Sequence, residues 1–170
     1  KSYERACEEW GLLCPGFSLR CLNAIPLCRG LGSSSTAVAG GVMIANSFRK
    51  DPLPVEELIP LMVEIEGHPD NVAPAFLGGF VIAGTSEGEL WVEVAPVMEG
   101  IELALFVPPH GLDTEVARGL IPAEIPHAVA AANGARTALI ALGLTHDPRL
   151  LLRGTEDFLH QGQRAEAAHE

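Results

Sequence analysis

The chain has 170 residues, 48% of them hydrophobic, which is enough to bury the core of one domain or of two small ones. Its 11 basic and 22 acidic residues give a formal net charge of −11, which argues against a nucleic-acid partner because such proteins need a basic face. The sequence has no uninterrupted run of about 18 apolar residues, so neither a membrane helix nor a membrane partner is expected. The four cysteines contain no Cys-x-x-Cys pair, which predicts buried free thiols and a cytoplasmic protein.

The N-terminal part of the chain predicts a helix followed by a strand. Residues Ser2–Trp10 place apolar side chains on one face at helical spacing, and Gly11 is well placed to end that helix. The run Phe17–Ala24 alternates apolar and polar residues at its start, which is typical of a half-buried strand.

A loop rich in glycine and hydroxyl residues follows, before a nearly all-apolar helix predicted over Thr36–Phe48. Two glycines let a backbone turn tightly and approach a ligand, and a helix N-terminus attracts anions. The loop therefore predicts a phosphate-binding site. It lacks the lysine of a Walker A loop and the third glycine of a dinucleotide fingerprint. Its residues are Pro26, Leu27, Cys28, Arg29, Gly30, Leu31, Gly32, Ser33, Ser34, Ser35 and Thr36.

The remainder of the chain mixes helices and strands without regular βαβ alternation, which predicts an α+β fold. A helix is expected from Pro54 to about Glu66, with a break or kink at Pro60. The later expected elements are a polar loop at Glu66–Asn71, a hairpin of Phe80–Ala83 with Glu89–Ala95, a strand at Ile101–Val107, a short helix from Asp113 to Leu120, and helices at Ala128–Leu144 and from Asp147 to about Leu159.

The polar loop is the second candidate for chemistry. Magnesium that carries nucleotide phosphates usually takes one or two protein carboxylates, which makes Glu66 a candidate ligand with Ser34 as the hydroxyl partner. Asp70 and Asn71 could align an acceptor hydroxyl. The alternative is a structural loop whose Asp and Asn side chains bond their own backbone. Arg118 and Arg164 could each fork onto a carboxylate or lie on a solvated surface.

These motifs together resemble the GHMP small-molecule kinases, named for the galactose, homoserine, mevalonate and phosphomevalonate enzymes. The pattern Pro26-x-x-x-Gly30-Leu31-Gly32-Ser33-Ser34 is similar to the nucleotide-binding motif of that family. The run from Glu66 to Ala75 with Gly78-Gly79 resembles the homoserine kinase branch, as do Thr114 with Arg118 and the later Leu159-His160-Gln161 with Arg164.

The resemblance implies ATP-dependent phosphorylation of the L-homoserine hydroxyl, a step toward threonine. It implies a first domain of the left-handed βαβ type, like that of a small-subunit ribosomal protein, over residues 1–97. A ferredoxin-like second domain would cover residues 98–170, with both domains incomplete, and a homodimer is expected from the family.

The resemblance also implies a role for each motif. Residues 26–36 would bind the triphosphate of ATP, and Ser34 and Glu66 would hold Mg²⁺. His68, Asp70 and Asn71 would contact the substrate, with Asp70 and Asn71 at the acceptor hydroxyl. Arg118, Arg164 and Thr114 would receive the carboxylate of homoserine.

Three features depart from the family pattern. Ser35-Thr36 replaces the usual alanine, and the short spacing between Glu66 and His68 makes Glu64 a rival metal ligand. The motifs that open and close the family lie outside this sequence, which predicts an internal fragment of a longer kinase. A kinase for another small alcohol, such as mevalonate, and a non-catalytic nucleotide-binding relative remain the alternatives.

Overall fold

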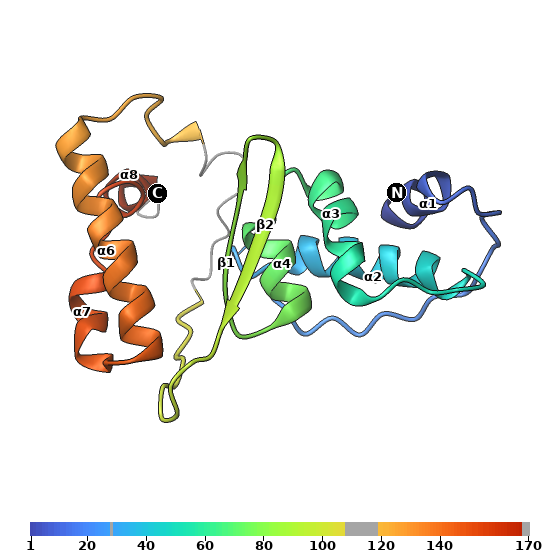
Figure 1. Cartoon of the computed structure of the whole chain (residues 1–170), viewed down its shortest axis with the longest axis horizontal. Helices are drawn as coiled ribbons and strands as arrows, with labels where there is room; N and C mark the ends of the chain where they lie inside the picture. The colour runs from blue at the N-terminus through green and yellow to red at the C-terminus, as the bar shows by residue number, and fades with distance from the viewer. Residues whose placement is uncertain (28, 108–118, 168–170) are drawn as a thin grey trace. The chain divides into compact units, whose positions relative to one another are not determined.

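The computed structural model describes residues 1–27, 29–107 and 119–167 (Figure 1). The chain divides into two compact units, which are described separately. One unit comprises Lys1–Leu27 and Leu31–Val94, and the other comprises Cys28–Gly30 and Ala95–Glu170.

Four helices and a hairpin make up the first unit. The helices are α1 (Ser2–Glu9), α2 (Ser33–Ser47), α3 (Val55–Glu66) and α4 (Pro69–Leu77), and the hairpin joins β1 (Phe80–Ser86) to β2 (Glu89–Ala95). The helix predicted at the N-terminus is confirmed. Helix α3 continues through Pro60, so the break predicted there does not occur, and the alternative of a kink stays a prediction. Pro60 is exposed, whereas its neighbours Ile59 and Leu61 are buried.

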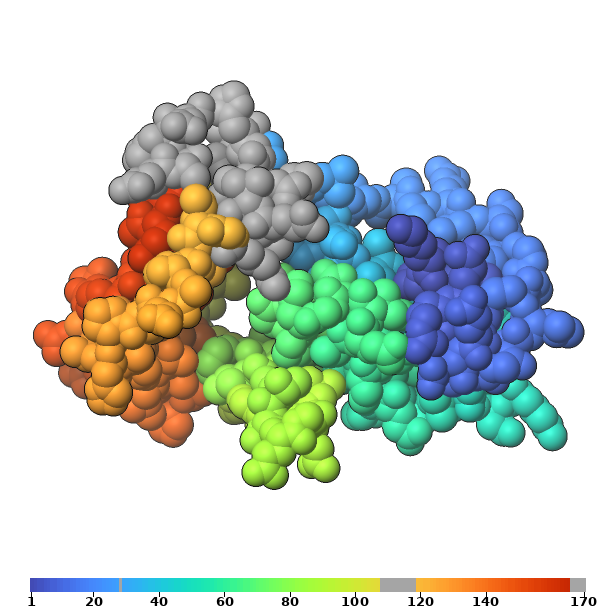
Figure 2. Space-filling model, turned by 90° about the horizontal axis from the view of Figure 1, so that it is seen from above, coloured from blue at the N-terminus to red at the C-terminus, as the bar shows by residue number. Residues whose placement is uncertain are grey.

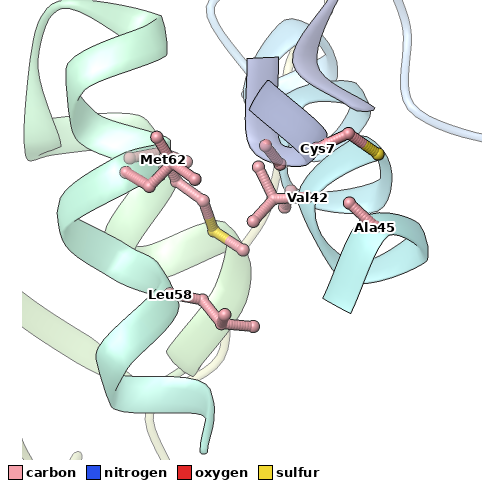
Figure 3. Packing of buried hydrophobic residues seen from close by; sticks show 9 residues of the cluster. Cys7, Val42, Ala45, Leu58 and Met62 are labelled. Carbon is pink, nitrogen blue, oxygen red and sulfur yellow. The ribbon is translucent and has the colours of Figure 1, made fainter. Parts of the chain in front are cut away.

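The apolar faces of α1, α2, α3 and α4 form one core. Leu58 and Met62 project from α3 towards Val42 on α2 (Figure 3). Cys7 of α1 is buried in the same cluster, whereas Cys14 and Cys21 are exposed, so the expectation of buried thiols holds for only one of these three. The buried members of the core are Ala6, Cys7, Ala39, Val42, Ala45, Leu58, Leu61, Met62 and Val72.

Close packing of α1 on α2 depends on Gly41. A Cβ atom at this position would lie 2.9 Å from the backbone nitrogen of Tyr3 and nearer still to the Ser2 hydroxyl. The N-terminal end of α1 is therefore the element packed against Gly41. Figure 2 shows the blue surface of α1 next to the green surface of α3.

The predicted hairpin is confirmed, but two other predicted strands do not form within the described residues. The runs Phe17–Ala24 and Ile101–Val107 carry strand-like patterns, yet the described sheet contains only β1 and β2. A strand requires a hydrogen-bonded neighbour, and these segments have none there. Their apolar side chains consequently lie open, with Leu22 87% and Phe106 95% exposed.

The second unit is built around the long helix α6 (His127–Thr145), close to the helix predicted there. After it come the 3₁₀ turn η1 (Pro148–Leu150), α7 (Leu151–Gly154) and α8 (Gln161–Ala167). The single helix predicted from Asp147 to Leu159 is therefore wrong. Helix α7 ends at Gly154, and the carboxylate of Asp157 accepts hydrogen bonds from the backbone N–H groups of Leu159, His160 and Gln161, which organises a new helix start.

Helix α6 is long and apolar enough to cross a membrane by length and composition alone. Two polar residues within it are tied to the rest of the second unit. Arg136 pairs with Glu156 at 2.7 Å, and Asn133 accepts a hydrogen bond from the Phe158 N–H. The expectation that the chain has no membrane partner stays a prediction.

Candidate active site

The glycine loop turns into α2 through two left-handed residues. Gly30 has φ of 67° and Gly32 has φ of 74°, and Gly32 caps the helix. A Cβ atom added at either position would meet nothing within 4 Å, so the backbone conformation, rather than crowding, requires glycine here.

Helix α2 begins at Ser33, three residues before its predicted start at Thr36. Its first intrahelical hydrogen bond runs from the Thr36 N–H to the Gly32 carbonyl at 2.9 Å. The preceding N–H groups of the first turn have no acceptor inside the helix, and neither a side-chain cap nor an acidic residue occupies this end. This helix end can therefore bind an anion, as the loop sequence predicted.

Asn23 fixes the backbone just before the glycine loop, a role that was not predicted from the sequence. Its side-chain oxygen accepts from the Ile25 N–H at 3.0 Å, and its amide donates to the Ile25 carbonyl and to Ser33 Oγ, each at 3.2 Å. An Asn that bonds the backbone two residues ahead is a common turn former. An asparagine three residues before Pro26 was the available signal.

Ser35 connects the loop helix to α3. Its side chain is only 1% exposed, and its Oγ donates a hydrogen bond of 2.7 Å to Oε1 of Glu66, the last residue of α3. The predicted metal pair was Ser34 with Glu66. The structure places Ser34 on the exposed side of the same helical turn and turns Ser35 toward Glu66.

Glu64, the rival metal ligand, faces elsewhere. It pairs with Arg5 of α1 at 2.6 Å, and Arg5 also pairs with Glu9 at 2.9 Å. Successive helical residues are rotated by about 100°, so side chains two apart point to nearly opposite sides. Glu64 therefore lies on the surface beside α1, whereas Glu66 lies beside the first turn of α2.

The predicted polar loop is mostly the start of α4. Gly67 ends α3, His68 precedes α4, and Pro69 opens it, so Asp70 and Asn71 lie in its first turn. His68 Nδ1 is hydrogen-bonded to Asp70 Oδ1, which places the proton on Nδ1 when the carboxylate is ionised. A dense run of polar residues indicated a loop, but Pro69 at the first helical position was the opposing signal.

Three predicted substrate-binding residues are not placed beside Glu66 and Asp70 by the structure. Thr114 and Arg118, like Cys28 in the loop, lie outside the described residues. Arg164 is an exposed residue of α8 in the second unit. Its role in binding the carboxylate of homoserine stays a prediction.

The residues around the loop fit a magnesium ion that arrives with a nucleotide. Within the described parts of the chain, no three His, Cys, Asp or Glu side chains cluster as a metal site. A resident ion held entirely by protein is thus not supported there. One carboxylate, Glu66, beside a helix N-terminus with several hydroxyls matches the donor set of Mg²⁺ shared between protein, phosphate and water.

Helices α1 to α4 all lie within the part of the chain that matches a family of small-molecule kinases. Residues 1–79 match the family model described as the GHMP kinases N terminal domain. Residues 1–79 thus carry the N-terminal domain of this family.

Within the family, the chain is similar to homoserine kinases over nearly its whole length. It is 41% identical to the homoserine kinase of Mycolicibacterium vanbaalenii over 98% of this chain and 56% of that protein. It is 44% identical to that of Streptomyces avermitilis over 91% of this chain and 52% of that protein. A crystal structure of homoserine kinase from Cytophaga hutchinsonii matches with a TM-score of 0.73 at 26% identity, covering 97% of this chain and 54% of that one.

These matches bear out the expected α+β fold of GHMP type. The chain spans about half the length of the curated relatives it matches, with 56% and 52% of the two proteins covered.

Proposed function

We propose that the natural full-length protein transfers the γ-phosphoryl group of ATP to the hydroxyl of L-homoserine, giving O-phospho-L-homoserine on the route to threonine. The observation that carries the proposal is the arrangement around α2. A glycine turn opens its N-terminus, Glu66 of α3 is hydrogen-bonded to its first turn, and α4, which carries Asp70, packs against it. The homoserine kinase similarity selects the acceptor.

The loop residues 26–36 would bind the triphosphate. The first-turn N–H groups of α2 lack helical acceptors and so can donate to phosphate oxygens without a Walker lysine. Ser34 and Glu66 would hold Mg²⁺, which when bound neutralises charge on the phosphates. The pairing of Glu64 with Arg5 supports Glu66 as the ligand.

Asp70 and Asn71 would align the acceptor hydroxyl at the start of α4. Phosphoryl transfer requires positioning and charge neutralisation more than covalent chemistry, so alignment is the main task of these two side chains. The bond between His68 Nδ1 and Asp70 Oδ1 helps to fix the orientation of this carboxylate. His68 would thereby support the substrate site through Asp70.

The remaining assignments of this proposal come from the family pattern. Arg118, Arg164 and Thr114 would bind the homoserine carboxylate, because the guanidinium fork of arginine matches a carboxylate. The protein would have two domains with a boundary near residue 97, would be cytoplasmic, and would form a homodimer.

Replacing the two glutamates of α3 in the full-length protein tests the nucleotide site. ADP release with ATP, Mg²⁺ and homoserine is measured for the wild type, Glu66→Ala and the matched control Glu64→Ala. We expect Glu66→Ala to lose about 10²-fold or more in turnover, because a charge that stabilises the transition state is removed, and Glu64→Ala to stay within about threefold. Unchanged turnover in Glu66→Ala would show that the metal assignment is wrong.

A further inference from the structure

Ser35 is the hydroxyl of the loop helix that reaches the carboxylate of α3. It is the third residue of α2, its side chain is 1% exposed, and its Oγ donates to Glu66 Oε1 at 2.7 Å. We propose that Ser35 is a positioning residue, which holds Glu66 in the orientation that binds Mg²⁺. The proposal rests on the proposed function, because it assumes that Glu66 is the metal ligand.

The other hydroxyls of the loop have different surroundings. Ser33 Oγ is hydrogen-bonded by Asn23, and Thr36 Oγ1 donates back to the Gly32 carbonyl at 3.0 Å. Ser34 is exposed in the first turn of the helix. Ser35 is therefore the one of the four that faces the protein interior and Glu66.

A serine can supply what this carboxylate needs. A hydroxyl has one proton to donate, so Ser35 occupies one lone pair of Oε1 and leaves Oε2 unbonded by this contact. A long, flexible glutamate loses rotamer freedom when it binds an ion. A hydrogen bond that already selects one rotamer removes part of that cost, so the ion binds more tightly.

The charges around Glu66 also favour one position of its carboxylate. Glu66 is the last residue of α3, where the helix dipole disfavours an anion, and its carboxylate meets the first turn of α2, where the dipole favours one. Among the ion pairs of the described residues, Lys and Arg side chains do not pair with Glu66, whereas Glu64 pairs with Arg5. The negative charge of Glu66 is thus left for a bound cation.

The test measures how Mg²⁺ supports ATP binding by the full-length protein. Calorimetric titrations with ATP are run over a series of Mg²⁺ concentrations and again in EDTA, for the wild type, Ser35→Ala, Ser35→Thr, Glu66→Gln and the double variant Ser35→Ala with Glu66→Gln. Ser47→Ala is the matched control, because Ser47 lies at the other end of the same helix and its Oγ donates to the Ile44 carbonyl at 2.7 Å, within its own helix. Circular dichroism checks the fold of each variant.

We expect Ser35→Ala to raise the Mg²⁺ concentration for half-maximal ATP binding by about three- to tenfold, the size expected when the typical net contribution of one hydrogen bond is lost. ATP affinity in EDTA should stay unchanged, Ser35→Thr should keep the wild-type Mg²⁺ dependence, and Ser47→Ala should behave as the wild type. In the Glu66→Gln background, Ser35→Ala should add nothing, because Ser35 acts through Glu66.

A folded Ser35→Ala protein with wild-type Mg²⁺ dependence, or an equal added loss on Glu66→Gln, would overturn the positioning role alone. If Ser35→Ala does not fold, Ser35→Cys takes its place, since a thiol of similar shape is a weak donor and should show the same loss. A wild-type protein whose ATP binding ignores Mg²⁺, with Glu66→Gln silent, would instead overturn the proposed function and the Ser35 role together.

Discussion

Gly32 and Ser35 share one helical turn and serve it in different ways. Gly32 has the left-handed conformation that lets the chain enter α2, with nothing within 4 Å of where a Cβ would lie. Ser35 points inward to Glu66 of α3. Gly32 thus sets the backbone conformation at the start of α2, and Ser35 links that first turn to α3.

Substituting Gly32 separates backbone strain from crowding. Gly32→Ala places an L-residue at φ of 74° and should cost about 1–2 kcal/mol of stability and weaken ATP binding. Gly40→Ala is the matched control, because it also meets nothing within 4 Å but has ordinary helical geometry, and it should gain roughly 0.5–1 kcal/mol. Denaturant unfolding and ATP titration measure both effects. Equal stability in the two variants would contradict the requirement for a left-handed residue.

At the scale of elements, the site depends on how the helices of the first unit pack together. Helix α2 contacts α1, α3 and α4, and each contact brings a different feature to it. Helix α3 places Glu66 against α2, and the start of α4 carries the hydrogen-bonded pair of His68 and Asp70. Helix α1 packs on α2 at Gly41, away from the first turn. A change in α1 should therefore alter stability without touching the site chemistry directly.

The α1–α2 contact gives a prediction on adjacent glycines. Gly41→Ala would bring a methyl group 2.9 Å from the Tyr3 backbone nitrogen and should destabilise the protein by about 1–3 kcal/mol, as overpacking does. Gly40→Ala, one residue earlier, should not destabilise it. Thermal unfolding of both variants checks the contrast, and a Gly41→Ala protein as stable as the wild type would show that α1 does not pack there in solution.

The start of α8 gives a pH prediction. Burial opposes ionisation of Asp157, but hydrogen bonds from the backbone N–H groups of Leu159, Gln161 and His160 outweigh it and lower the pKa of this carboxyl. Because the folded pKa lies below the unfolded one of about 3.9, the stabilisation is complete above that pH and is lost as the pH falls through the folded value.

The variants Asp157→Ala and Asp157→Asn check this pH effect. Asp157→Ala should cost about 1–2 kcal/mol at neutral pH. The wild type should lose more stability between about pH 5 and pH 3 than Asp157→Asn, whose side chain does not titrate in that range. Denaturant unfolding at several pH values measures the difference. Parallel pH curves for the two proteins would contradict the charged role of Asp157.

At the scale of the molecule, the sequence predicted elements whose signals are local. The helix at Ser2–Trp10, the long helix near Ala128–Leu144, the hairpin and the glycine turn all follow from patterns within a few residues. The contact of Ser35 with Glu66 could not be read the same way. Which of three adjacent serines faces inward depends on the rotation of α2, and that depends on its start at Ser33.

Other predicted elements differ from the structure because they depend on contacts between distant parts of the sequence. The alternating runs at Phe17–Ala24 and Ile101–Val107 have strand patterns, but pairing depends on a neighbour that local sequence does not reveal. The polar run at Glu66–Asn71 carried both loop and helix-start signals, and Pro69 at the first position of α4 decided between them. The roles of Asp70, Asn71, Thr114, Arg118 and Arg164 remain predictions.

The central claim is that the full-length protein phosphorylates homoserine. Incubation with ATP, Mg²⁺ and equal amounts of homoserine and mevalonate, followed by mass spectrometry of the products, tests it most directly. We predict O-phospho-L-homoserine formed in step with ADP, and no phosphorylated mevalonate. Phosphorylation of mevalonate but not of homoserine, or ADP release without any phosphorylated acceptor, would contradict the account.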